Sequence, residues 1–318
     1  MRFRTNQEEV IMIRSGAALL WAASLLAGLA GAEHRVLCSA NDKLVVVSPG
    51  GEVEWEVPWK GGTHDLHVLP NGNLLAIRDG HVVVEVDRAT KKDVWTYDSA
   101  AMNGNAGKRV EVHAIQPLAD GNVMIAESGP ARIIEVDRQG TLLKSIALKV
   151  DKPDPHRDTR LARKVDSGNY LVCHEGDGVV REYDGGGKVV WEFPVPLFGK
   201  EPKPGHGPES FGNQVFGAIR MKNGNTLIGT GNGHAVIEVT PEKEIVWEVH
   251  QNDLAGITLA WITTVMMKPN GNVVFGNCHA GPGQPQIVEI EHDSRHVIWT
   301  FAHFDMLGND MTNSVLLD

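Results

Sequence analysis

The chain has 318 residues, of which 42% are hydrophobic, and its formal net charge at pH 7 is −10. This hydrophobic content is typical of a globular protein and excludes a disordered chain. The negative charge and the lack of any long basic run exclude nucleic acid as a partner. The three cysteines fall in apolar, strand-like contexts, so we expect buried thiols rather than a disulfide or a zinc motif.

The N-terminal segment has the pattern of a signal peptide. Arginines precede an uncharged apolar run at residues 16–30, and the small residues at 30–32 fit a cleavage site. The run is shorter than the roughly 20 apolar residues that span a bilayer. We therefore expect residues 1–32 to be removed, no membrane span to remain, and the mature protein to be secreted or periplasmic. Met12 is an alternative start to Met1, because residues 12–32 form a complete signal peptide.

A turn motif recurs along the rest of the chain. It reads Asn-Gly-Asn or a close variant and lies between two alternating apolar runs each time, with glycines at 72, 121, 168, 224 and 271. The steps between these glycines are 49, 47, 56 and 47 residues. Asn-Gly between alternating runs predicts a β-hairpin, because both turn residues adopt positive φ.

A tryptophan follows at a fixed phase in five of the repeats, seven or eight residues after an acidic or polar turn residue. The unit after Asp137 has lost it. A tryptophan repeated once per unit predicts packing between neighbouring sheets, so we expect these side chains to be buried and structural. They are Trp55, Trp95, Trp191, Trp247 and Trp299.

Each repeat contains four short strand patterns, which is typical of a propeller blade. Residues 34–58 supply only three strands, and residues 312–317 look like the missing innermost one. The sequence therefore predicts an all-β, six-bladed propeller over residues 33–318, with four antiparallel strands per blade. The C-terminal strand joins the N-terminal blade, which removes the open sheet edges.

The repeat resembles two known propeller families. Residues 64–75 (HDLHVLPNGNLL) are similar to the repeat of bacterial arylsulfotransferases, and residues 86–95 (VDRATKKDVW) to the PQQ-like quinoprotein repeat. The first resemblance implies a channel histidine that accepts the sulfuryl group, and His64 is the position that matches. The chain departs from both families: quinoprotein dehydrogenases have eight blades and typically adjacent cysteines, and arylsulfotransferases are much longer.

The loops on one face vary in length, and variable loops on a rigid scaffold commonly carry function. Alignment on the turn motif identifies the residue that opens each innermost strand. Three neighbouring blades present ionisable side chains there: His64, His113 and Arg160. The equivalents in the other blades are Phe216, Thr263 and Thr312.

We therefore predict that His64, His113 and Arg160 form a catalytic cluster at the channel mouth. His174, His234, Trp261 and His279 flank it as ligand-binding residues. Arginine binds oxyanions and histidine transfers protons near neutral pH. Because the channel should be solvated, we expect substitutions in the cluster to leave the fold intact.

Several functions fit this site. The first is binding of a small anionic or carbohydrate-like ligand. The second is enzymatic, either arylsulfotransferase-like sulfuryl transfer through His64 or a histidine-assisted lyase or hydrolase reaction. The third is a scaffold for a protein partner. A metal held by His64, His113, His174 and His279 stays open, although no pair has diagnostic ligand spacing. No cofactor is identified.

Overall fold

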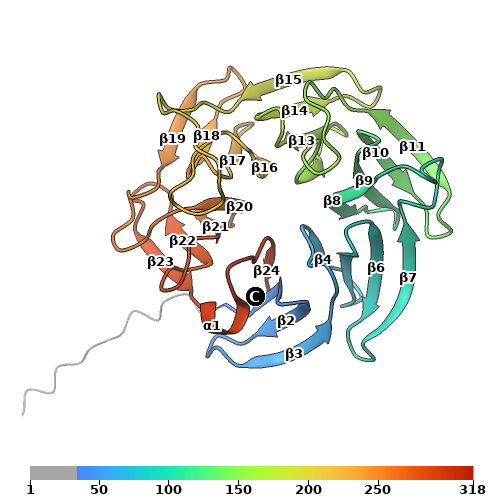
Figure 1. Cartoon of the computed structure of the whole chain (residues 1–318), viewed down its shortest axis with the longest axis horizontal. Coiled ribbons are helices and arrows are strands. Elements are labelled where there is room, and N and C mark those ends of the chain that lie inside the picture. Colours follow the sequence, from blue (N-terminus) through green and yellow to red (C-terminus); the bar gives the residue numbers. More distant parts are fainter. Residues whose placement is uncertain (1–33, 318) are drawn as a thin grey trace, which may run out of the picture. The chain divides into compact units, whose positions relative to one another are not determined.

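The computed structural model describes residues 34–317, so the expected signal segment at residues 1–32 lies outside the described residues. Six four-stranded antiparallel sheets stand as blades around a central axis (Figure 1). This confirms the predicted six-bladed propeller. The single helix of the described part is one short turn, α1 (Phe304–Leu307), before the last strand. No helix among the described residues is long and apolar enough to cross a membrane.

The strands of each blade follow the chain outward from the axis. Blade 1 consists of β24 (Ser314–Leu316), β1 (Val36–Ala40), β2 (Lys43–Val47) and β3 (Val53–Pro58). Blade 2 consists of β4 (Leu66–Val68), β5 (Leu74–Arg78), β6 (Val82–Asp87) and β7 (Lys92–Asp98). Blade 3 consists of β8 (Glu111–Pro117), β9 (Val123–Ser128), β10 (Arg132–Val136) and β11 (Leu142–Ala147).

The remaining blades repeat this order. Blade 4 consists of β12 (Ala162–Lys164), β13 (Tyr170–His174), β14 (Val179–Tyr183) and β15 (Val189–Pro194). Blade 5 consists of β16 (Gly217–Arg220), β17 (Thr226–Gly229), β18 (Val236–Val239) and β19 (Ile245–Val249). Blade 6 consists of β20 (Trp261–Met267), β21 (Asn272–Cys278), β22 (Ile287–Glu291) and β23 (Val297–Phe301).

The ring closes between the two ends of the described chain. Strand β24 pairs antiparallel with β1 through three residue pairs, of which Cys38 opposite Ser314 is one. The amide of Leu317 extends this pairing by donating to the carbonyl of Arg35 at 2.8 Å. The C-terminal strand is therefore the innermost strand of the N-terminal blade, as the repeat predicts.

The Asn-Gly turns join the first and second strand of the continuous blades. In blade 2, Gly72 has a φ of 84° and donates its amide to the carbonyl of Leu69 at 2.8 Å. Only glycine adopts this backbone conformation without strain, which explains why it recurs at this position.

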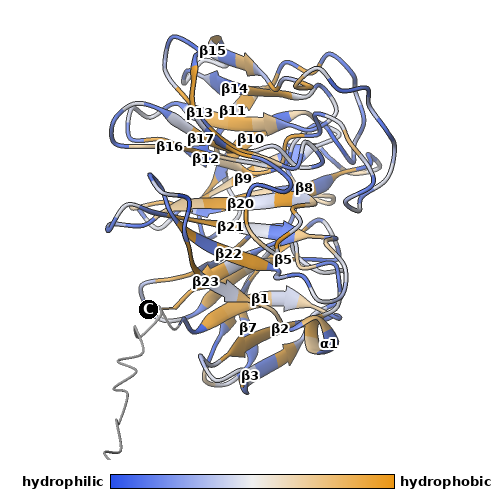
Figure 2. Cartoon of the chain, turned by 90° about the vertical axis from the view of Figure 1, so that its left-hand side faces the viewer, coloured by the Kyte–Doolittle hydropathy of each residue, from blue (hydrophilic) through white to orange (hydrophobic). Residues whose placement is uncertain are grey.

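The core lies between the blades rather than in one central mass. Apolar side chains of the inner strands interlock with those of the next blade, and Figure 2 shows hydrophobic colour along the strands and hydrophilic colour in the loops. Cys38, Cys173 and Cys278 are buried and unpaired, as expected.

The repeated tryptophans correct one expectation. All five lie on the outermost strand of their blades, where Trp247 is buried but Trp55, Trp95, Trp191 and Trp299 are partly exposed. They still connect neighbouring blades, since four of them donate the indole N–H to a backbone carbonyl of the next blade. These bonds are Trp55 to Arg88 (2.9 Å), Trp95 to Arg138 (2.8 Å), Trp191 to Pro241 (3.0 Å) and Trp247 to His292 (2.7 Å).

A glutamate in the third strand of blades 2 to 6 accompanies this arrangement. These residues are Glu85, Glu135, Glu182, Glu238 and Glu289. In blade 5, Glu238 accepts a hydrogen bond from Asn225 in the turn and lies 2.8 Å from Nε2 of His292. The ring of His292 stacks on Trp247 with centroids 4.6 Å apart. All five glutamates contact a basic or hydroxyl group of the next blade, and all but Glu135 also accept from an asparagine in the turn of their own blade.

Candidate functional site

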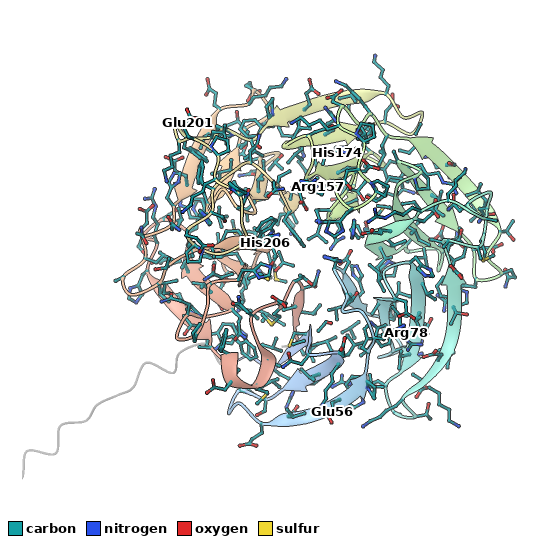
Figure 3. The ribbon with its side chains drawn as sticks, in the orientation of Figure 1. Glu56, Arg78, Arg157, His174, Glu201 and His206 are labelled. Carbon is teal, nitrogen blue, oxygen red and sulfur yellow. The ribbon has the colours of Figure 1, made fainter. Side chains whose placement is uncertain are left out.

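A cavity of about 620 Å³ opens at the face where the innermost strands begin. Four of the predicted residues line it: His64, Arg160, Trp261 and His279. The volume is in the range of small-molecule sites. Arg157 and His206, which also line it, lie toward the centre of the ring, whereas Glu56 lies at the rim (Figure 3).

The three strand-opening residues come together on one side of the cavity. The rings of His64 and His113 meet edge to face with centroids 4.8 Å apart. Nη1 of Arg160 lies 3.1 Å from the ring nitrogens of His113. The pairing of β8 with β9 shifts register at His113, and such a bulge redirects a side chain out of the regular ladder.

Arg160 is buried against a carboxylate that the sequence analysis missed. Arg160 and Glu175 are 4% and 3% exposed, and Nε of Arg160 contacts Oε2 of Glu175. Nη1 also donates to the carbonyl of His156. Burial raises the pKa of Glu175, although Arg160 counteracts the effect. Arg160 is therefore held within the wall and is not a solvated channel residue.

The histidines of this wall are kept neutral. Burial lowers the pKa of His64 well below its usual value, and the neighbouring His113 and Arg160 lower it further. Burial and then Arg160 lower the pKa of His113 to about 4. At neutral pH both imidazoles are unprotonated, which is the form that accepts a proton.

Glu111, His113 and His156 are the one group of potential metal ligands in the described residues, with ligand atoms within 4.8 Å of one another. Nδ1 of His156 lies 2.7 Å from Glu111, and its Nε2 lies 3.1 Å from Nη2 of Arg160. A metal bound to Nδ1 of His156 would leave the ring proton on Nε2. The Nε2–H of His156 and the Nη2–H of Arg160 would then be two donors facing each other. The hydrogen-bonded form without metal fits this geometry better.

Two predicted ligand-binding residues do not reach the cavity. His174 is fully buried, and its ring contacts the carbonyl of Asp158 at 2.7 Å and the hydroxyl of Tyr183 at 2.8 Å. His234 is buried too, with both ring nitrogens on backbone carbonyls. The repeat register placed them on the correct face but did not give their depth. We remove both from the candidate site, and His174 also from the set of candidate metal ligands.

The opposite side of the cavity is aromatic. His206, from the long loop before blade 5, packs on Trp261 and His279 with centroid distances of 5.0 and 5.1 Å. Phe216 lies 6.1 Å from His64 across the axis, and its carbonyl accepts the amide of Leu161 at 3.0 Å. A second cavity of about 320 Å³ farther along the axis shares no lining residue with the first.

Comparison with known proteins identifies the family. A family model described as outer membrane protein assembly factor BamB matches residues 40–301, which is most of the propeller. The chain belongs to this BamB-like family. The match extends over all six blades and agrees with the PQQ-like repeat seen in the sequence, whereas the arylsulfotransferase resemblance is not reproduced. No curated protein sequence matches this BamB-like propeller.

Solved structures support the fold of the BamB-like chain. A protein of unknown function from Bacteroides caccae has a TM-score of 0.73 at 21% identity and covers 90% of this chain and 99% of its own. A streptogramin B lyase has a TM-score of 0.56 at 12% identity, covering 82% and 76%. A catalytically inactive variant of virginiamycin B lyase from Staphylococcus aureus with quinupristin has a TM-score of 0.55 at 11% identity, covering 85% of each chain. At these identities the likeness concerns the fold alone.

Proposed function

We propose that this BamB-like propeller binds a small polar ligand in the cavity, with His64 as a proton acceptor facing it. The observation that carries the proposal is a small-molecule-sized cavity containing an imidazole that burial and neighbouring positive charge keep neutral. Perturbed titratable groups in a concave site are typical of functional sites. In line with the signal-like N-terminus, the ligand would be met outside the cytoplasm, in a secreted or periplasmic setting.

The charges around the cavity favour a ligand of low charge. Each lining arginine already has a carboxylate partner: Arg109 pairs with Glu111 at 2.7 Å, Arg157 with Asp154 at 2.8 Å, and Arg160 with Glu175. A sulfate or phosphate group would have to compete with these carboxylates for the guanidinium charge. A carbohydrate-like ligand therefore fits better than a strong anion, and sulfuryl transfer is the less favoured chemistry.

A histidine-assisted lyase or hydrolase is the second candidate function. His64 and Glu175 line the same cavity, and their surroundings push the histidine toward its neutral form and the carboxyl toward its protonated form. The neutral imidazole of His64 can remove a proton, whereas Glu175 could supply one only after giving up its ion pair with Arg160. The protein-scaffold alternative has weaker support, since exposed large apolar residues are spread over the outer strands, as with Val94, Leu143, Val190 and Val246.

The proposal is tested by observing the imidazole of His64 directly. Nitrogen NMR spectra of the mature protein and of its His64→Gln variant assign the ring signal of His64. This signal should keep the chemical shift of a neutral imidazole throughout pH 5 to 8. A screen of neutral glycosides, uronic acids and sulfated sugars should then contain compounds that shift this signal and raise the melting temperature. If His64 titrates near pH 6.5 like a free imidazole, or if no compound moves its signal, the proposal fails.

A further inference from the structure

The two walls of the cavity differ in their free hydrogen-bonding capacity. On the wall formed by His64, His113, Arg160 and Glu175, the charged groups are engaged with one another, as described above. On the wall formed by His206, Gln214, Trp261 and His279, which we call the aromatic wall, several polar groups have no partner in residues 34–317. A ligand gains most where its groups meet unused donors and acceptors, because engaged groups must first exchange partners.

The unused groups of the aromatic wall are specific atoms. The indole N–H of Trp261 makes no hydrogen bond with the described residues, in contrast to the blade-connecting tryptophans, which donate to carbonyls. Gln214 accepts from Asn232 at 2.8 Å through its oxygen, which leaves its NH₂ group unused. The ring nitrogens of His206 are also without a partner in the described part of the chain.

These donors lie among ring faces. His206 packs on both Trp261 and His279, so ring surfaces and hydrogen-bonding atoms lie together on one side of the cavity. The face of an aromatic ring carries partial negative charge, which attracts weakly positive C–H groups. A sugar ring has C–H groups on its faces and hydroxyl groups at its edge, and each hydroxyl both donates and accepts a hydrogen bond.

We infer that the aromatic wall is a subsite for a neutral sugar ring, bound by Trp261, Gln214 and His206. The inference rests on the proposed function and adds to it the ligand class and the residues that select it. The anchored base of the long loop supports a fixed position for His206: the carbonyl of Ser210 accepts from buried His234 at 2.6 Å, and the carbonyl of Pro208 from Gln251 at 2.7 Å.

The test measures affinity for methyl glycosides of glucose, galactose and mannose by calorimetry. At least one should bind the mature wild-type protein. Trp261→Phe, which keeps the ring and removes the N–H, should weaken binding about five- to tenfold, as for loss of one buried hydrogen bond. His206→Ala, an exposed loop position, should weaken it severalfold without affecting folding. Trp299→Phe, far from the cavity on the outer strand β23, is the matched control and should bind like wild type.

The outcomes separate the subsite from the proposed function. If uronic acids or sulfated sugars shift the His64 signal but no neutral glycoside binds, the proposed function stands and the sugar subsite is wrong. The subsite is also wrong if a neutral glycoside binds and its affinity falls in His64→Gln but not in Trp261→Phe or His206→Ala. If no compound of any class binds, both are overturned.

Discussion

Replacing Arg160 by alanine should destabilise the protein strongly, contrary to the expectation from a solvated channel. The guanidinium is 4% exposed and is the ionic partner of Glu175, which is 3% exposed. Its removal leaves a buried carboxylate without a counter-charge and the carbonyl of His156 without this donor. Breaking a buried ion pair by removing one partner costs about 3–5 kcal/mol of unfolding free energy.

A second substitution isolates the cause. In the Arg160→Ala, Glu175→Gln double variant no buried charge remains, so about 2 kcal/mol of the loss should be recovered. Arg157→Ala is the control, because its side chain is 45% exposed and its pair with Asp154 should contribute less than about 1 kcal/mol. Urea unfolding at pH 7, followed by circular dichroism, measures all three. A loss below about 1 kcal/mol in Arg160→Ala, or no recovery in the double variant, would refute the reasoning.

The remaining predictions concern acid, packing and closure. The pKa values of buried His113 and His174 are lowered to about 4 by burial and then by a nearby arginine, so the unfolded chain binds more protons between pH 6.5 and 4. Stability should therefore fall on acidification through this range by up to about 3 kcal/mol per histidine, and urea unfolding of His174→Gln at pH 7 and 4.5 should show a weaker dependence. Trp247→Ala should cost about 3 kcal/mol, more than Trp191→Ala, because Trp247 is more buried; equal losses in chemical unfolding would contradict this. Deleting residues 312–318 should expose the edge of β1 and give self-association in size-exclusion chromatography, whereas a monomer with unchanged melting temperature would show that closure is dispensable.

The fold could be predicted because its signals are local and repeated. The glycine of the Asn-Gly turn needs a positive φ, so it marks the first hairpin of blades 2 to 6, and the same count places residues 312–317 beside the first blade. The glutamates of the third strands were missed, because their partners lie in the next blade. His292 on Glu238 is one example, and no spacing within a repeat indicates it.

The candidate site could be predicted only in part. Repeat register brings strand-opening residues to one end of the axis, which is how His64, His113 and Arg160 were found together. The repeat register does not show how deeply a side chain is buried. It therefore could not distinguish His174, which is buried, from His64, which lines the cavity. It also gives no account of loops, so the position of His206 over Trp261 depends on a path that only the structure defines.

His64 and Phe216 from opposite blades line the larger cavity, whereas Leu161, which donates to the carbonyl of Phe216, lines the smaller one, and the two cavities share no lining residue. A molecule held in the larger cavity would exchange with solvent through the face that carries the long loop of His206. Because the same loop supplies His206 to the proposed sugar subsite, changes to its length should alter the equilibrium affinity as well as the rates of association and dissociation.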